Sequence, residues 1–151
     1  MTSRWLRRSG RASRWLVDGM NLIGSRPDGW WRNLDAAVTR TIAELSAYAG
    51  ASNEDVSVVF DGRPEGVRAG AHGSVTVAFA SSAGRDAADD EIARMVAEDS
   101  APESIRVVTS DRRLAERVSR RGASVVSASA FRRRLESGSE GWRRQRPAAP
   151  S

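Results

Sequence analysis

Short apolar runs alternate along this chain with segments in which apolar residues recur every three or four positions. The runs are rich in valine and isoleucine and are bounded by glycine or polar residues, which is typical of strands; they lie at 14–17, 56–60, 74–79, 105–109 and 123–126. The periodic segments have the spacing of amphipathic helices and lie at 33–50, 86–99 and 112–122. The pattern therefore predicts strands and helices in alternation.

The first periodic segment also carries end signals. Asn33 is placed as its N-cap, and Gly50 suits a C-terminal stop. We therefore expect this helix to span 33–50.

Strands that alternate with helices favour an α/β fold, a three-layer α/β/α sandwich around a mostly parallel central sheet. The runs at 56–60 and 105–109 are apolar almost throughout, as expected of strands covered on both faces. We expect one domain at 14–136, after a basic tail at 1–13. Glycine, serine, arginine and proline dominate 137–151, which predicts a basic, disordered C-terminal tail.

An aspartate follows three of the predicted strands. Asp18 follows Val17, Asp61 follows Phe60, and Asp111 comes two residues after Thr109. Parallel strands place their carboxyl ends at one edge of a sheet, where ligands bind in open α/β folds. Asp89 and Asp90, in the first turn of the helix at 86–99, add two acids, so the sequence predicts a carboxylate cluster if these strands are neighbours.

Several ionised carboxylates remain close together only when a cation lies between them. The chain has no cysteine and one histidine, His72, in a glycine-rich loop that indicates an exposed residue rather than a general base. Carboxylate oxygens without histidine or cysteine favour Mg²⁺ or Mn²⁺ over zinc. A metal ion bound in this way commonly catalyses reactions at phosphate groups.

Charge is segregated along the chain. All the basic residues are arginines: five without an acid at 1–14, and eleven against three glutamates at 112–146. Between these ends, residues 15–111 carry sixteen acids against eight arginines. This distribution indicates a cation-holding centre flanked by surfaces for an anionic polymer, although all-arginine usage is equally explained by a GC-rich genome and a solvated surface.

Each acid taken singly also has a structural explanation. An aspartate after a strand is often a turn or helix-capping residue, and the acids at 86, 89 and 90 fit an ordinary helix start. Ser110 is equally suited to cap the helix that starts at Asp111 and to position a phosphate. The combination in one chain favours a site.

Four segments, "VDGMNLI", "VVFDG", "AADDEI" and "VVTSDRRLAERVSRRGASVVSASAFRRRL", occur in an order and at spacings that resemble the YacP-like branch of the NYN domains, relatives of the PIN nucleases. The resemblance covers about 14–136. It implies a PIN-like α/β/α sandwich, a divalent-metal site and endoribonuclease activity that is sometimes ribosome-associated.

The resemblance also implies roles for single residues. Asp18, Asn21, Asp89 and Asp111 match the family's catalytic positions, and the metal would be held by Asp18, Asp89 and Asp111, with Asp90 as a further ligand. Asp61 matches a recurrent aspartate of the family whose role stays open between contact with metal or substrate and shaping its loop. Apart from the resemblance, Ser110 and Arg112 are candidates for contact with substrate or metal. RNA binding is expected of Arg85, Arg113, Arg143 and Arg144.

The function expected is therefore a Mg²⁺- or Mn²⁺-dependent endoribonuclease acting on single-stranded or ribosome-associated RNA. Two alternatives stay open: a non-catalytic RNA- or ribosome-binding module, and a phosphohydrolase of small nucleotides. The absence of cysteine, of a long apolar run and of a signal peptide predicts a cytoplasmic protein that uses no membrane.

Overall fold

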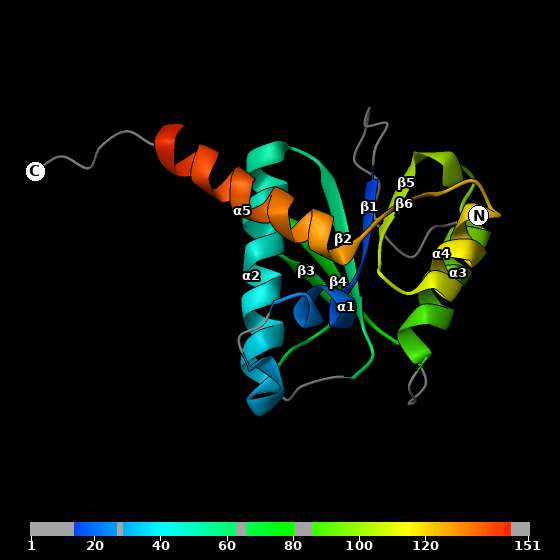
Figure 1. The fold of residues 1–151 in the computed structure, drawn as a ribbon, viewed down its shortest axis with the longest axis horizontal. Helices are drawn as coiled ribbons and strands as arrows, with labels where there is room; N and C mark the ends of the chain where they lie inside the picture. Colours follow the sequence, from blue (N-terminus) through cyan, green and yellow to red (C-terminus); the bar gives the residue numbers. More distant parts are fainter. Residues whose placement is uncertain (1–13, 27–28, 63–65, 81–85, 146–151) are drawn as a thin grey trace, which may run out of the picture.

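The computed structural model describes residues 14–26, 29–62, 66–80 and 86–145, except for the side chains of Trp30 and of residues 138–145. Its centre is a six-stranded sheet in the order β3-β4-β2-β1-β5-β6 (Figure 1). Of the described strands, β3 alone is antiparallel to its neighbour. The strands are β1 Arg14–Asp18, β2 Asp55–Phe60, β3 Gly70–His72, β4 Val75–Phe79, β5 Ile105–Val108 and β6 Ser124–Val126.

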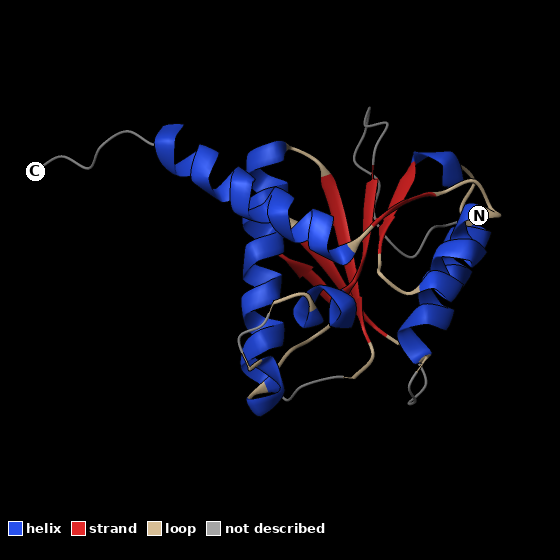
Figure 2. Cartoon of the chain, in the orientation of Figure 1, coloured by secondary structure: helices blue, strands red, loops and turns tan. Residues whose placement is uncertain are grey.

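Helices cover both faces of this sheet (Figure 2). They are α1 Gly19–Gly24, α2 Leu34–Ser52, α3 Ala87–Glu98, α4 Arg112–Ser119 and α5 Ala128–Gln145, with short 3₁₀ helices η1 Trp30–Arg32 and η2 Pro102–Ser104. The predicted three-layer α/β/α sandwich with a mostly parallel sheet is confirmed. None of the described helices is long and apolar enough to span a lipid bilayer.

The two faces of the sheet have separate apolar cores because side chains alternate along each strand. Trp15 and Val17 of β1 point to the core under α1, α2 and α5, whereas Leu16 points to the core under α3 and α4. Phe131 of α5 packs on Trp15 with ring centroids 4.8 Å apart. This contact holds α5 across the first face.

The order in which strands are added to the sheet switches sides at β1. β2 lies on one side of β1, and β5, which follows α3, lies on the other. In open α/β sheets such a reversal leaves a crevice outside the carboxyl ends of the strands. The acids predicted to form a site lie at this edge.

Helix α1 was not predicted, because no loop separates it from β1. Asp18 is both the last residue of β1 and the N-cap of α1, so the helix starts at Gly19. A Cβ atom at position 19 would collide with the ring of Phe60. Glycine is therefore required for α1 to pack against the end of β2.

The predicted end of α2 at Gly50 is wrong. The helix continues to Ser52, and Asn53 ends it in the left-handed conformation with φ 61°. Asparagine tolerates this conformation better than other non-glycine residues, so it serves as the stop here. The N-cap was predicted correctly, since the Asn33 side chain accepts a hydrogen bond from the backbone N–H of Ala36 at 3.0 Å.

Part of the predicted C-terminal tail is helical, and residues 146–151 lie outside the described residues. Helix α5 continues to Gln145, through Gly138 and Gly141 (Figure 1). Buried Phe131, Arg132 and Leu135 fix its first turns. The helix continues beyond these residues although each of its two glycines costs about 1 kcal/mol relative to alanine.

Candidate active site

Three neighbouring strands bring the predicted acids to one edge of the sheet. Asp18 ends β1 opposite Val59 of β2, and Asp61 follows β2 directly. On the other side, Val17 pairs with Val108 of β5, which places Thr109 next to Asp18. The convergence expected of Asp18, Asp61 and Asp111 follows from the order β2-β1-β5.

Asp18 is the most enclosed acid of the cluster, with a relative exposure of 2 %. Its Oδ2 atom accepts hydrogen bonds from Nδ2 of Asn21 at 3.0 Å and from Oγ1 of Thr109 at 3.1 Å. Its Oδ1 atom accepts from the backbone N–H of Asn21 at 3.3 Å. These donors fix the carboxylate in one orientation at the end of β1.

Asn21 and Thr109 join β1 to the loop after β5. Asn21 Oδ1 accepts from the backbone N–H of Ser110 at 2.8 Å. Thr109 Oγ1 accepts from the backbone N–H of Asp111 at 3.1 Å, in addition to its bond to Asp18. The Asn21 amide thus uses its oxygen and its nitrogen within the protein, and Thr109, a position without a predicted role, connects Asp18 to Asp111.

Asp61 positions the helix that carries Asp89. Its Oδ1 accepts from the backbone N–H of Ala88 at 2.8 Å and so holds the start of α3 against the end of β2. Asp86, the N-cap residue, makes no side-chain capping bond. Asp61 thereby brings Asp89, in the first turn of α3, to the sheet edge.

Asp111 caps α4. Its Oδ1 accepts from the backbone N–H groups of Arg113 at 2.8 Å and Leu114 at 3.1 Å. The Leu114 N–H is the main cause that lowers the pKa of Asp111, and a hydrogen bond from Asp89 lowers it further. Asp111 is therefore the ionised partner of the Asp89–Asp111 pair.

The other two acids have raised pKa values. Burial, together with the charges of Asp61 and Asp111, raises the pKa of Asp18 to about 6, against the lowering effect of Asn21 and Thr109. Burial, then the charges of Asp18 and Asp111, raises the pKa of Asp89 to about 7. Asp89 is thus the acid that holds a proton most readily, next to an ionised Asp111.

These pKa shifts bear on whether the acids are only helix caps. Asp18 and Asp111 do cap α1 and α4, as the structural explanation expected. A capping carboxylate has a lowered pKa because backbone N–H groups and the helix dipole stabilise its charge. Asp111 behaves in this way, but the pKa values of Asp18 and Asp89 are raised, first by burial and then by neighbouring acids, and such shifts are typical of functional sites.

The donor set fits a hard divalent cation with an open coordination sphere. Among the described residues, no three acidic or histidine side chains converge closely enough to enclose a metal ion as they stand. Mg²⁺ commonly takes one or two carboxylates and completes its shell with water and substrate phosphates. Asp89 and Asp111 form such a pair, with Asp18 close enough to perturb Asp89, and these oxygen donors suit Mg²⁺ or Mn²⁺.

Several other predicted residues lie apart from this cluster. Asp90 is exposed and pairs with Arg117 of α4 at 2.9 Å, so the structure turns it away from Asp89. Ser110 caps α5 rather than α4, because its Oγ accepts from the backbone N–H of Ala128 at 3.1 Å. His72 lies on β3 with Nε2 2.6 Å from the carbonyl oxygen of Arg68.

The predicted arginines divide into two groups. Arg112 and Arg113 are exposed in the first turn of α4, beside Asp111. Arg85 lies outside the described residues, as do the side chains of Arg143 and Arg144, whose backbone belongs to α5.

The raised pKa of Asp18 predicts a pH dependence of stability in metal-free buffer. The folded chain holds this proton up to a pH of about 6, whereas the ordinary pKa of an aspartate is 3.8. The free energy of unfolding should therefore fall as the pH rises from about 4 to 6, by about 3 kcal/mol for this group. Urea unfolding of the wild type and of Asp18→Asn isolates the effect as a pH-dependent difference; a difference that stays constant with pH would contradict it.

Comparisons with known proteins agree with this fold. A family model of the YacP-like NYN domain matches residues 15–148. The fold is similar to the crystal structure of Rae1 (YacP) from Bacillus subtilis, with a TM-score of 0.72 and 26 % identity over 88 % of this chain and 79 % of that chain. A single-substitution mutant of Rae1 (YacP) from Bacillus subtilis gives the same TM-score and identity over 87 % and 80 %. A comparison with curated proteins finds no significant match.

The match spans almost all of the described fold and includes every acid of the cluster. The chain therefore belongs to the YacP-like NYN domain family, a branch of the PIN-like nucleases.

Proposed function

We propose that this protein is an endoribonuclease that uses Mg²⁺ or Mn²⁺ at the cluster of Asp18, Asp89 and Asp111. The observation that carries the proposal is the raised pKa of Asp18 and Asp89, caused by burial and by neighbouring carboxylates. Such a cluster is unfavourable without a cation, and the helix caps made by Asp18 and Asp111 do not account for Asp89 beside them.

Each acid has a separate task in this proposal. A bound divalent ion would polarise the scissile phosphate and lower the pKa of a bound water. Asp111, kept ionised by its N–H donors, supplies a permanent ligand charge. Asp89, with a pKa of about 7 in the metal-free site, would lose its proton when the cation binds and become the second carboxylate ligand.

Asn21 and Thr109 act through Asp18 in this scheme. Together they donate three hydrogen bonds to its carboxylate and tie it to the loop that carries Asp111. Partners of this kind orient ligands and hold their geometry. We therefore assign Asn21 as a positioning residue, in place of the catalytic role expected from the sequence.

RNA is the substrate that the family and the charge distribution favour. The eleven arginines at 112–146 suit an extended polyanion better than a small nucleotide. A pure binding module would gain nothing from buried acids that repel one another and the RNA. A ribosome-associated substrate and a cytoplasmic location remain part of this proposal.

The test is cleavage of a circular single-stranded RNA by the purified full-length chain. A circle has no ends, so only an endonuclease converts it to linear products. We expect linear RNA in the presence of Mg²⁺ or Mn²⁺ and intact circles with EDTA. Binding of the circle without cleavage in either metal would instead support the binding module.

A further inference from the structure

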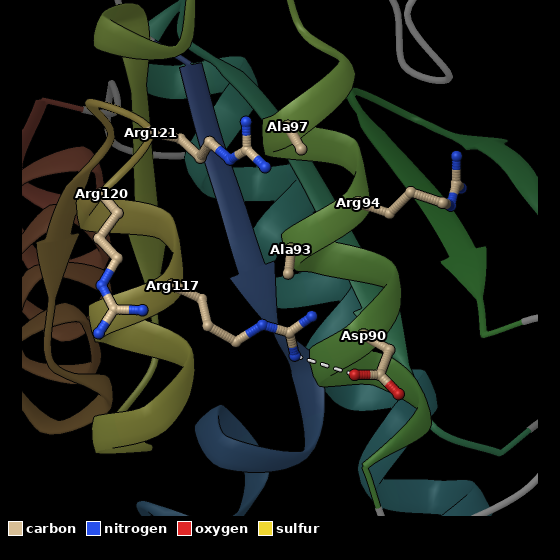
Figure 3. A pocket seen from close by; sticks show the side chains of 7 residues that line it. All are labelled: Asp90, Ala93, Arg94, Ala97, Arg117, Arg120 and Arg121. Carbon is tan, nitrogen blue, oxygen red and sulfur yellow. Dashed lines mark hydrogen bonds and ion pairs between the residues drawn. The ribbon is translucent and has the colours of Figure 1, made fainter.

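A groove lined by arginines runs between α3 and α4 (Figure 3). It has a volume of about 290 Å³, with Ala93 and Ala97 of α3 facing it. Four arginines line it: Arg94 from α3, Arg117 from α4, and Arg120 and Arg121 just after α4. Asp90 is the acid among its lining residues. The lining is therefore strongly cationic.

The four arginines differ in what they bind within the protein. Arg117 pairs with Asp90 at 2.9 Å, and Arg94 is 2.8 Å from Glu98 and also bonds Glu91. No hydrogen bond or ion pair joins the exposed side chains of Arg120 and Arg121 to other described residues. These two guanidinium groups are available to an external anion, for which their fork of N–H donors is well suited.

The groove adjoins the carboxylate cluster. Asp90 follows Asp89 in the chain, and α4, whose N-cap is Asp111, leads to Arg120 and Arg121. The eight residues of α4 rise about 12 Å, so the unpaired arginines lie roughly that far along the groove from the acids. A single RNA strand is long enough to contact the carboxylate cluster and the unpaired arginines at the same time.

We propose that this groove binds the sugar-phosphate backbone of single-stranded RNA next to the bond that the cluster cleaves. This inference rests on the proposed function, and it specifies where the RNA lies on the protein surface next to the carboxylate cluster. The phosphates bind Arg120 and Arg121, and Arg117 joins them when it leaves Asp90. The small volume suits one strand, whereas a duplex is too wide to enter it.

The test is the affinity of the full-length chain for a labelled single-stranded RNA, measured by fluorescence anisotropy in EDTA over a range of salt concentrations. Each phosphate contact contributes about 0.7 to the slope of log affinity against log salt. Arg120→Gln/Arg121→Gln should flatten the slope by about 1.4 and weaken binding about 25-fold near 0.1 M salt. Asp90→Asn should strengthen binding about fivefold, because it releases Arg117.

The control is Arg32→Gln/Arg40→Gln, which removes the same charge from exposed positions of η1 and α2, outside the groove and outside 112–146. It should change the affinity less than twofold. If the Arg120/Arg121 variant binds RNA like this control, the proposal is wrong, and an acidic protein surface becomes the better occupant of the groove. Because EDTA prevents cleavage, this outcome is independent of whether the protein is a nuclease.

Discussion

Asp89→Asn is expected to lower metal-dependent RNA cleavage by about 10²- to 10⁴-fold, the size of a lost proton-transfer or charge-stabilising group. Asp89 is the acid whose pKa is raised to about 7 beside Asp111 without metal, so a bound divalent cation has the most to gain by holding it ionised as a ligand. Single-turnover cleavage at saturating Mn²⁺ measures the loss.

The same variant should not be less stable than the wild type. Neutralising Asp89 removes its repulsion from Asp18 and Asp111, so metal-free melts at pH 8 should show an equal or higher Tm. Asp35→Asn, which neutralises an exposed acid in the first turn of α2, is the matched control and should leave cleavage unchanged. Full activity in Asp89→Asn, or a large loss of its stability, would show that Asp89 is a structural residue.

Thr109→Val is expected to lower cleavage about 10- to 100-fold and to destabilise the fold by about 1–3 kcal/mol. Valine has nearly the same shape but removes the hydroxyl that donates to Asp18 at 3.1 Å and accepts from the Asp111 N–H at 3.1 Å. Both partners then lose a buried hydrogen bond. Single-turnover kinetics and urea unfolding measure the two effects.

Thr76→Val provides the comparison for Thr109. Thr76 lies half-buried on β4, two strands away from β1, where valine suits a strand equally well. This control should retain cleavage and stability. Equal behaviour of the two variants would mean that the Thr109 hydroxyl does not support the site.

The central acids could be predicted because strand ends are visible in the sequence. Asp18, Asp61 and Asp111 each follow an apolar run, and a parallel sheet has one carboxyl edge. The strand order was the missing information. The structure supplies it by placing β2 and β5 on either side of β1.

Side-chain direction could not be predicted. Asp89 and Asp90 are adjacent on α3 and chemically identical, so both were expected to bind the metal, although the family resemblance gave only Asp89 a catalytic role. Successive helical residues point about 100° apart, and this rotation turns Asp89 to Asp111 and Asp90 to Arg117. For the same reason, the sequence does not reveal that Arg120 and Arg121 are unpaired among the described residues. The arginine-rich segment at 112–146 does not show which of its side chains have partners.

The hydrogen bonds that support Asp18 also lay beyond the sequence. Thr109 and Asp18 are far apart in the chain and become neighbours through the register of β1 and β5. Asp61 had no assignable role until its bond to the Ala88 N–H showed that it holds α3 in place. The position of Thr109 at the end of a predicted strand, just before Ser110, was the one sequence feature that could have suggested a role for it at the site.

Mn²⁺ binding, measured by calorimetric titration of the wild type and of Asp89→Asn, tests the central claim most directly. The account predicts one saturable binding process in the wild type that is at least about tenfold weaker in Asp89→Asn, in line with the loss of a ligand. Asp35→Asn should bind Mn²⁺ like the wild type. Equal affinity in the wild type and Asp89→Asn, or no saturable binding in either, would contradict a metal centre at these carboxylates.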